Sequence, residues 1–270
     1  MTVRDIQRPA TIRLDVASPA TLAGLEGLRR LRPLVHCNTN SIAAGFMANV
    51  LLAIGASPVM AASREEVAEL AAVAGAISIS VASVTEDKAD ALLRSAAAAK
   101  AAGTPWVLDP VAVGALGFRT WVVDQLLAFQ PTVIKGNASE ILTLAGYDGR
   151  SQGADSTACA GEALAAACEL SVARRAVVVV TGATDYVADG RQVYEICGGH
   201  PLMAQVTGTG CALGAVIAAF LAAGLNPQGA ATAACCTFAL AGEKAGRVAQ
   251  GSGSFAACFL DQLCRLGLSD

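Results

Sequence analysis

Polar residues that could bind phosphates and metal ions follow two short apolar runs. Asp109 follows Val107-Leu108, whereas Asn137 and Glu140 follow Val133-Ile134. Carboxylate and amide oxygens suit Mg²⁺, and open α/β sheets bind ligands beyond the carboxyl ends of their strands. Simpler alternatives stay open. Asp109 could only cap the next turn, and Asn137 with Glu140 three residues later could be only a capping box at a helix start.

A glycine-rich segment contains the next candidates. Gly208, Thr209, Gly210 and Cys211 precede an apolar stretch with helical spacing. Backbone N–H groups at a helix N-terminus suit a phosphate or a moving phosphoryl group, so this segment is a candidate anion hole. It matches neither the phosphate-binding P-loop nor the dinucleotide fingerprint, and a plain loop before a core helix is the alternative. We expect the helix terminus to lower the pKa of the Cys211 thiol from about 8.5. Cys211 could otherwise be a small buried residue.

Three single residues at other predicted strand ends complete the candidate set. Lys135 directly follows the apolar run Val133-Ile134, and Thr181 follows four consecutive valines, Val177 to Val180. Met60 lies five residues after Gly55 and by spacing alone could be ordinary core. A flexible thioether could also contact an aromatic heterocycle.

Alternating strand and helix patterns predict an α/β fold that would bring these ends together. We expect a single domain, 1–270, with an open, mostly parallel sheet, helices on both faces, and an N-terminal extension with a first helix in 1–30. Alternation around Asp189-Gly190 predicts a hairpin, Asp185 to Glu195, as an antiparallel edge of the sheet. The predicted strands are Ala76–Val81, Trp106–Leu108, Thr132–Ile134 and Val177–Val180; the predicted helices are Ile42–Ile54, Asp87–Ala102, Ala158–Leu170, Cys211–Leu225, Gln228–Ala249 and Phe255–Leu266.

Composition excludes several classes of protein. The net charge is −3, with 19 basic and 22 acidic residues, so we expect no nucleic-acid partner. The one basic cluster, Arg29, Arg30 and Arg32, is interpreted as a solvated helix end. Nine cysteines without a C-x-x-C spacing and only two histidines argue against zinc or disulfides. Charged residues near the start of the sequence argue against a signal peptide. Two stretches without charged residues, 33–63 and 196–242, are interrupted by Asn, His and Pro, which argues against membrane-spanning helices. We therefore expect a cytoplasmic protein without membrane contact.

Taken together, these segments resemble the hydroxyethylthiazole kinase family of the ribokinase-like superfamily. The resemblance covers most of residues 33 to 260. It is carried, in the family's order, by PLVHCNTN, LLAIGASPVM, LDPVAVGALGFR, GNASEI, VVVVTG, DYVADG, GGHPLM, VTGTGCALGAV and GSGSF.

The resemblance implies an ATP- and Mg²⁺-dependent kinase that phosphorylates the primary alcohol of 4-methyl-5-(2-hydroxyethyl)thiazole in thiamine biosynthesis or salvage. It also implies a homotrimer whose thiazole sites are shared between neighbouring subunits. Carried over residue by residue, it implies thiazole contacts at Met60 and Gly208 and ATP contacts at Lys135 and Thr181. It implies a magnesium and phosphate site at Asp109, Asn137 and Glu140. Cys211 occupies the position where related sugar kinases have a catalytic Asp.

Two other functions remain open. The first is a different ribokinase-like activity, such as a sugar or pyrimidine kinase or a nucleotide-dependent repair dehydratase, although such kinases usually have Asp where this chain has Cys211. The second is a thiazole-binding protein without turnover. It is motivated by three departures. The family more often has Arg where this chain has Lys135, Glu where it has Ala183, and Lys or Arg where it has Gln205.

Overall fold

One nine-stranded sheet organises the part of the chain that the structure, a computed structural model, describes: residues 11–147 and 163–267. The strand order is β1-β9-β8-β7-β6-β5-β4-β2-β3, and β8 alone runs antiparallel to its neighbours. The strands are β1 (Thr11–Leu14), β2 (Leu34–Asn38), β3 (Ser57–Val59), β4 (Ala76–Ser80), β5 (Trp106–Asp109), β6 (Val133–Asn137), β7 (Val177–Thr181), β8 (Thr184–Ala188) and β9 (Val193–Cys197).

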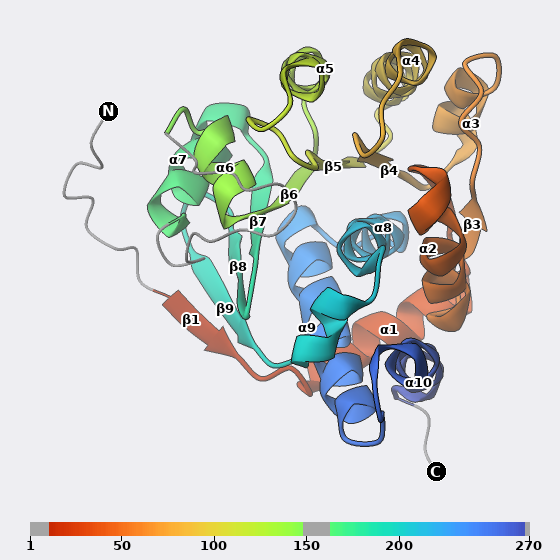
Figure 1. The fold of residues 1–270 in the computed structure, drawn as a ribbon, viewed down its shortest axis with the longest axis vertical. Helices are drawn as coiled ribbons and strands as arrows, with labels where there is room; N and C mark the ends of the chain where they lie inside the picture. The colour runs from red at the N-terminus through yellow and green to blue at the C-terminus, as the bar shows by residue number, and fades with distance from the viewer. Residues whose placement is uncertain (1–10, 148–162, 268–270) are drawn as a thin grey trace.

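Helices cover both faces of this sheet (Figure 1). One face carries α1 (Pro19–Leu31), α2 (Ser41–Ala53), α8 (Thr209–Ala222), α9 (Pro227–Gly246) and α10 (Ser252–Arg265). The other carries α3 (Val67–Val73), α4 (Glu86–Ala102), α5 (Gly117–Leu127), α6 (Ala138–Leu144) and α7 (Leu164–Arg174). A short 3₁₀ helix, η1 (Pro201–Gln205), precedes α8.

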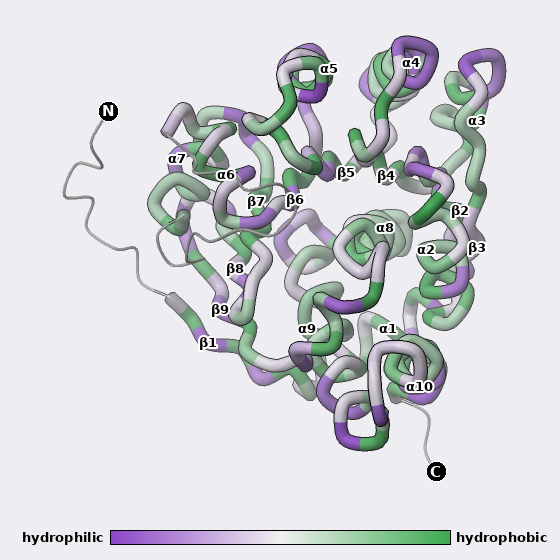
Figure 2. Tube along the Cα trace, viewed as in Figure 1, coloured by the Kyte–Doolittle hydropathy of each residue, from purple (hydrophilic) through white to green (hydrophobic). Residues whose placement is uncertain are grey.

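The strands contribute alternate side chains to two separate cores. Val177 and Val179 of β7 pack on the side of α8 and α9, whereas Val178 and Val180 pack on the opposite side. This explains the uninterrupted valine run, because both faces of β7 are buried. Figure 2 shows hydrophobic residues along α8, and hydrophilic ones gather at the outer ends of α3, α4 and α5. None of the helices in the described ranges is long and apolar enough to cross a membrane.

The predicted fold class is confirmed, with a correction at one sheet edge. The hairpin forms as β8 and β9, and Gly190 takes a φ of 83° in its turn. It is not the edge, however, because β1 pairs in parallel with β9 and covers it, with Thr11 opposite Val193. The hairpin therefore lies where it was predicted, but the prediction that it forms the edge of the sheet was wrong. The first part of the helix predicted over Ala158–Leu170 lies outside the described residues, and α7 continues to Arg174.

The basic cluster at the end of α1 is also more than a solvated helix end. Arg30 and Arg32 are exposed, but Arg29 is half-buried and its guanidinium reaches the last turn of α10. Its Nη2 donates to the carbonyls of Leu263 at 2.8 Å and Cys264 at 2.9 Å, and its Nη1 donates to that of Leu266. These carbonyls lack partners within the helix and carry its negative dipole end, so a cation there is favourable.

We expect Arg29→Ala to lower the free energy of unfolding by about 1–3 kcal/mol, because it removes charged hydrogen bonds that hold α10 against α1. Urea denaturation measures this loss. The matched control is Arg30→Ala, which removes an exposed charge and should change stability by less than about 0.5 kcal/mol. Equal effects of the two substitutions would show that the carbonyl contacts contribute nothing.

Candidate active site

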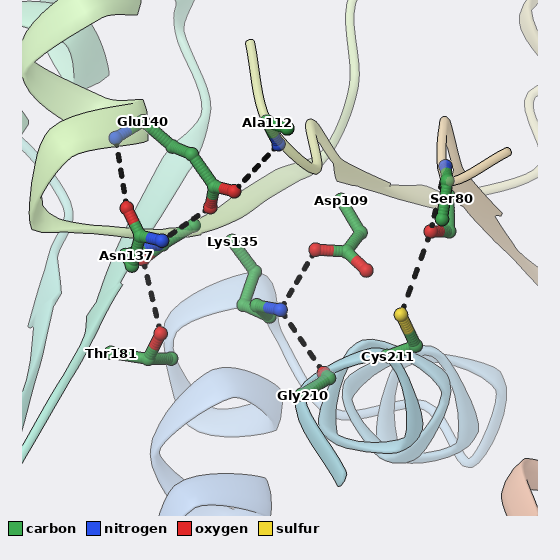
Figure 3. Close-up of polar contacts among 11 residues, drawn as sticks. Ser80, Asp109, Ala112, Lys135, Asn137, Glu140, Thr181, Gly210 and Cys211 are labelled. Atoms are coloured by element: carbon green, nitrogen blue, oxygen red, sulfur yellow. Dashed lines mark hydrogen bonds and ion pairs between the residues drawn. The ribbon is translucent and has the colours of Figure 1, made fainter. Parts of the chain in front are cut away.

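The carboxyl ends of the central strands and the N-terminus of α8 meet at one edge of the sheet (Figure 3). Ser80 ends β4, Asp109 ends β5, Asn137 ends β6 and Thr181 ends β7. Register fixes their order, since β4 pairs with β5, β5 with β6 and β6 with β7. The sequence-predicted Asp109, Asn137, Glu140 and Thr181 thus lie along a single edge, as expected for an open α/β sheet.

A buried ion pair lies at the centre of this edge. Lys135 Nζ lies 2.8 Å from Asp109 Oδ1 and donates at 3.0 Å to the carbonyl of Gly210. Both side chains are almost fully enclosed, with 4% of Lys135 and 1% of Asp109 exposed. Burial, the largest single influence, disfavours the charged ammonium, but the negative groups around it, Asp109 first, together raise the pKa of Lys135 above its ordinary value. Lys135 therefore ties two strands to the first turn of α8.

Glu140 forms the capping box that its spacing allowed. Asn137 Oδ1 accepts from the backbone N–H of Glu140 at 3.0 Å, and Glu140 Oε2 accepts from that of Asn137 at 2.8 Å. The other carboxylate oxygen accepts from the backbone N–H of Ala112 at 2.9 Å, which ties the loop after β5 to α6. Burial and then the Asp109 charge raise the pKa of Glu140 to about 6. The capping alternative is thus realised, and it fixes both oxygens beside Asp109.

Asp109 retains an unused acceptor. Its Oδ2 is buried and has no hydrogen-bond partner, while its Oδ1 accepts from Lys135. The described residues contain no cluster of three or more His, Cys, Asp or Glu side chains that could hold a metal by themselves. Mg²⁺ commonly takes one or two protein carboxylates and completes its shell with phosphates and water. The unpartnered oxygen of Asp109 and the nearby Glu140 fit that pattern.

Cys211 occupies the predicted position in the first turn of α8, but its pKa differs from the expectation. Gly208 is the N-cap, with a φ of 90°, and Cys211 Sγ lies 3.6 Å from Ser80 Oγ. Burial, and then the Asp109 charge, raise the pKa of Cys211 to about 12. The lowered pKa expected from the helix terminus was wrong, because burial and a neighbouring carboxylate outweigh the dipole. Cys211 is therefore a neutral thiol at pH 7.

The two remaining predicted residues are Met60, which follows β3, and Gly208, the N-cap of α8. Met60 follows β3, at the opposite edge of the sheet from β1, and is partly buried against the core beneath α2 and α8. Gly208 packs closely on the first turn of α2, where an added Cβ would lie 3.3 Å from the Cα of Ala43. Its positive φ and this close approach both require glycine. The sequence did not single out Ser80, whose hydroxyl contacts Cys211, because a lone serine ending a strand gives no distinctive pattern.

Comparisons with known proteins agree with one another. Residues 25–268 match the family model described as the Hydroxyethylthiazole kinase family. A hydroxyethylthiazole kinase of Leptospira borgpetersenii is 49% identical over 262 residues, which cover 96% of this chain and 99% of that protein. One from Pectobacterium atrosepticum is 46% identical over 256 residues, covering 95% and 97%.

Solved structures give the same picture. The structure of a hydroxyethylthiazole kinase protein from Pyrococcus horikoshii OT3 superimposes with a TM-score of 0.83 at 38% identity, covering 91% of this chain and 92% of that one. A ribokinase-like superfamily protein from Enterococcus faecalis has a TM-score of 0.66 at 14% identity and covers 98% and 99%, which is a likeness of fold alone.

The buried pair predicts a stability effect that is independent of turnover. Lys135→Met leaves the Asp109 carboxylate enclosed without its cation, so we expect the free energy of unfolding to fall by about 3–5 kcal/mol. Adding Asp109→Asn removes the unpaired charge and should recover part of this loss. Urea denaturation of the single variant, the double variant and the parent measures both changes in the free energy of unfolding. A Lys135→Met protein as stable as the parent would mean that the pair is not formed.

Proposed function

The chain belongs to the hydroxyethylthiazole kinase family, and we propose that the edge described above is where it transfers phosphate. The reaction moves the γ-phosphoryl group of ATP to the primary alcohol of 4-methyl-5-(2-hydroxyethyl)thiazole, in thiamine biosynthesis and salvage. The family match over residues 25–268 is the observation that carries this function.

The order of the strands supports a division of the edge into two halves. Met60 and Gly208, on the side of β3 and α2, would hold the thiazole, whereas Thr181 of β7 and Lys135 of β6 would face ATP. Cys211 contacts Ser80 of β4, between the two halves. The position of its thiol therefore suits the point where the alcohol oxygen meets the phosphoryl group.

Phosphoryl transfer needs little covalent help from the protein. In a loose transition state the bond from the γ-phosphorus to ADP breaks early, so positioning and charge neutralisation dominate. We assign the backbone N–H groups of Gly208, Gly210 and Cys211 to the moving phosphoryl oxygens, since that of Thr209 donates to the carbonyl of Val206. Since Cys211 is a neutral thiol, its role is to orient the alcohol. The hydroxyl proton then passes to a phosphoryl oxygen and on to water.

We propose that Lys135 has a structural role in addition to the ATP contact that the resemblance implies. Its ammonium has three N–H bonds, of which one is used by Asp109 and one by Gly210. The third is used by neither of these partners and would serve a phosphate oxygen without breaking the buried pair. This supports a role in which Lys135 holds the start of α8 in place and adds positive charge beneath the phosphates.

Magnesium is the proposed metal, held by Asp109 and Glu140 with Asn137 at the same strand end. The buried, unpartnered Oδ2 of Asp109 supports this assignment. When bound, Mg²⁺ neutralises charge on the β- and γ-phosphates.

We propose that the thiazole site is shared between subunits of a homotrimer. The support is Ile42, a large apolar residue that is 70% exposed in the first turn of α2, beside the Ala43 against which Gly208 packs. A cytoplasmic location is supported by the described cysteines, which are all unpaired. ATP, the co-substrate, is supplied there.

ATP consumption that depends on added hydroxyethylthiazole tests the reaction. Coupled detection of ADP should show turnover with this alcohol and none without it. Consumption only with a hydroxymethylpyrimidine or a sugar would overturn the substrate. Binding of the thiazole without any ADP release would favour the binding-protein alternative.

Cys211→Ser should lower kcat by about tenfold or less, since a hydroxyl can still orient the alcohol and a loss of about 10²–10⁴ is typical when a general base is removed. Initial rates at saturating substrates measure the change. Cys211→Ala, which retains no polar hydrogen, should lose more. A serine variant slower by 10³-fold or more, with unchanged folding, would contradict the orienting role and identify the thiol as the base.

Glu140→Gln should raise the Mg²⁺ concentration needed for half-maximal rate, because an amide binds this ion less well than a carboxylate. It also presents an NH₂ group to one of two backbone N–H donors, at a cost of about 1–3 kcal/mol of stability. A magnesium titration and a melting curve on the same sample separate the effects. Lost stability with normal magnesium dependence would leave Glu140 with the capping box alone.

A further inference from the structure

Lys88 extends over the site from a part of the sequence that showed no motif. It lies in the first turn of α4, where its backbone N–H donates to the Thr85 side chain. Its Nζ turns back and donates at 2.6 Å to the carbonyl of Ala82, in the loop that follows β4. Cys211 and Arg119 are the ionisable groups close enough to influence it. Ala82 comes two residues after Ser80, whose hydroxyl contacts Cys211, so Lys88 places a cation on the loop next to that thiol.

The fold alone does not account for a cation at this position. A lysine in the first turn of a helix is opposed by the positive end of the helix dipole. Burial, and then the Arg119 charge, lower the pKa of Lys88 to about 8, although Cys211 opposes the shift. The ion pairs found among the described residues do not include Lys88. A half-buried cation without an anionic partner fits an anionic ligand.

A cavity of about 460 Å³ gives Lys88 access to such a ligand. It lies between the loop after β3, which begins at Met60, and the first turn of α4. Its charged lining residues are Arg64, Glu65, Asp87 and Lys88. Arg64 is hydrogen-bonded to Glu65 and feels the charge of Asp87, so the four charged lining residues together carry no net charge. Of the two lining cations, Arg64 is held in an ion pair with Glu65, whereas Lys88 is in none of the ion pairs found among the described residues.

We propose that Lys88 binds the phosphate of the product, with Arg119 adding positive charge from α5. The inference rests on the transfer site assigned above. In the reaction, the alcohol oxygen forms a bond to the γ-phosphorus and the β,γ-bridging bond breaks, leaving its electron pair on ADP. The phosphoryl group thus moves from the ATP half of the edge towards the thiazole half. Two N–H bonds of the Lys88 ammonium are not used by Ala82 and suit its oxygens there.

Binding of the product tests this without turnover. Calorimetric titration with hydroxyethylthiazole phosphate at pH 7 should show an affinity on the order of tenfold weaker in Lys88→Met, from the loss of a charged hydrogen bond. Affinity for unphosphorylated hydroxyethylthiazole should not change. Lys100→Met is the matched control, since Lys100 lies at the exposed far end of α4 and donates to the carbonyl of Ala128. Lys88→Arg should bind product within about threefold of the parent. Equal product affinity in Lys88→Met and the parent would overturn the proposal.

The pH profile distinguishes a binding cation from a base. The charge of Lys88 is present below its pKa of about 8 and is lost above it, so the affinity for hydroxyethylthiazole phosphate should fall as pH rises through 8. Lys88→Arg should move this fall to higher pH, and Lys88→Met should remove it. A rate that rises through pH 8 and depends on Lys88 would instead make the neutral amine a proton acceptor and overturn the binding role. A parent protein that binds the product through Lys88 but does not phosphorylate hydroxyethylthiazole would refute the assigned reaction and not this contact.

Discussion

The arrangement of the whole site depends on the enclosed pair of Lys135 and Asp109. Two charges taken out of water are stable only when their geometry is good and their remaining donors are used. Here the same ammonium also holds the carbonyl of Gly210, so the pair fixes the first turn of α8 against β5 and β6. The N–H groups of that turn and the thiol of Cys211 take their positions from it. A site built from loops on separate strands is thereby held by one buried cation.

Most of the fold could be predicted because its signals are local. The valine run of β7, the hairpin turn at Asp189-Gly190 and the cap of α2 at Asn40 each depend on neighbouring residues. β1 could not be predicted in the same way. Its four residues are mostly exposed, and its only structural reason is pairing with β9, about 180 positions later. Arg29 was misjudged for a similar cause, since its partners lie at the other end of the chain.

For the site, residue positions were more predictable than residue properties. Strand ends and helix spacing indicated Asp109, Asn137 and Glu140 correctly as neighbours on one edge of the sheet. The pKa of Cys211 was not predictable, because it depends on burial and on the carboxylate of Asp109, which only the folded chain brings near. Lys88 gave no signal at all, since a lysine near a helix start is ordinarily a solvated residue.

The contact between Arg29 and the last turn of α10 has a consequence for how the chain folds during synthesis. Arg29 and its carbonyl partners are 234 to 237 positions apart, so this contact cannot form until the later residues have been synthesised. β1 likewise has no strand to join until β9 has been made. Closure of the ends is a late event, and such non-local closure is intrinsically slow.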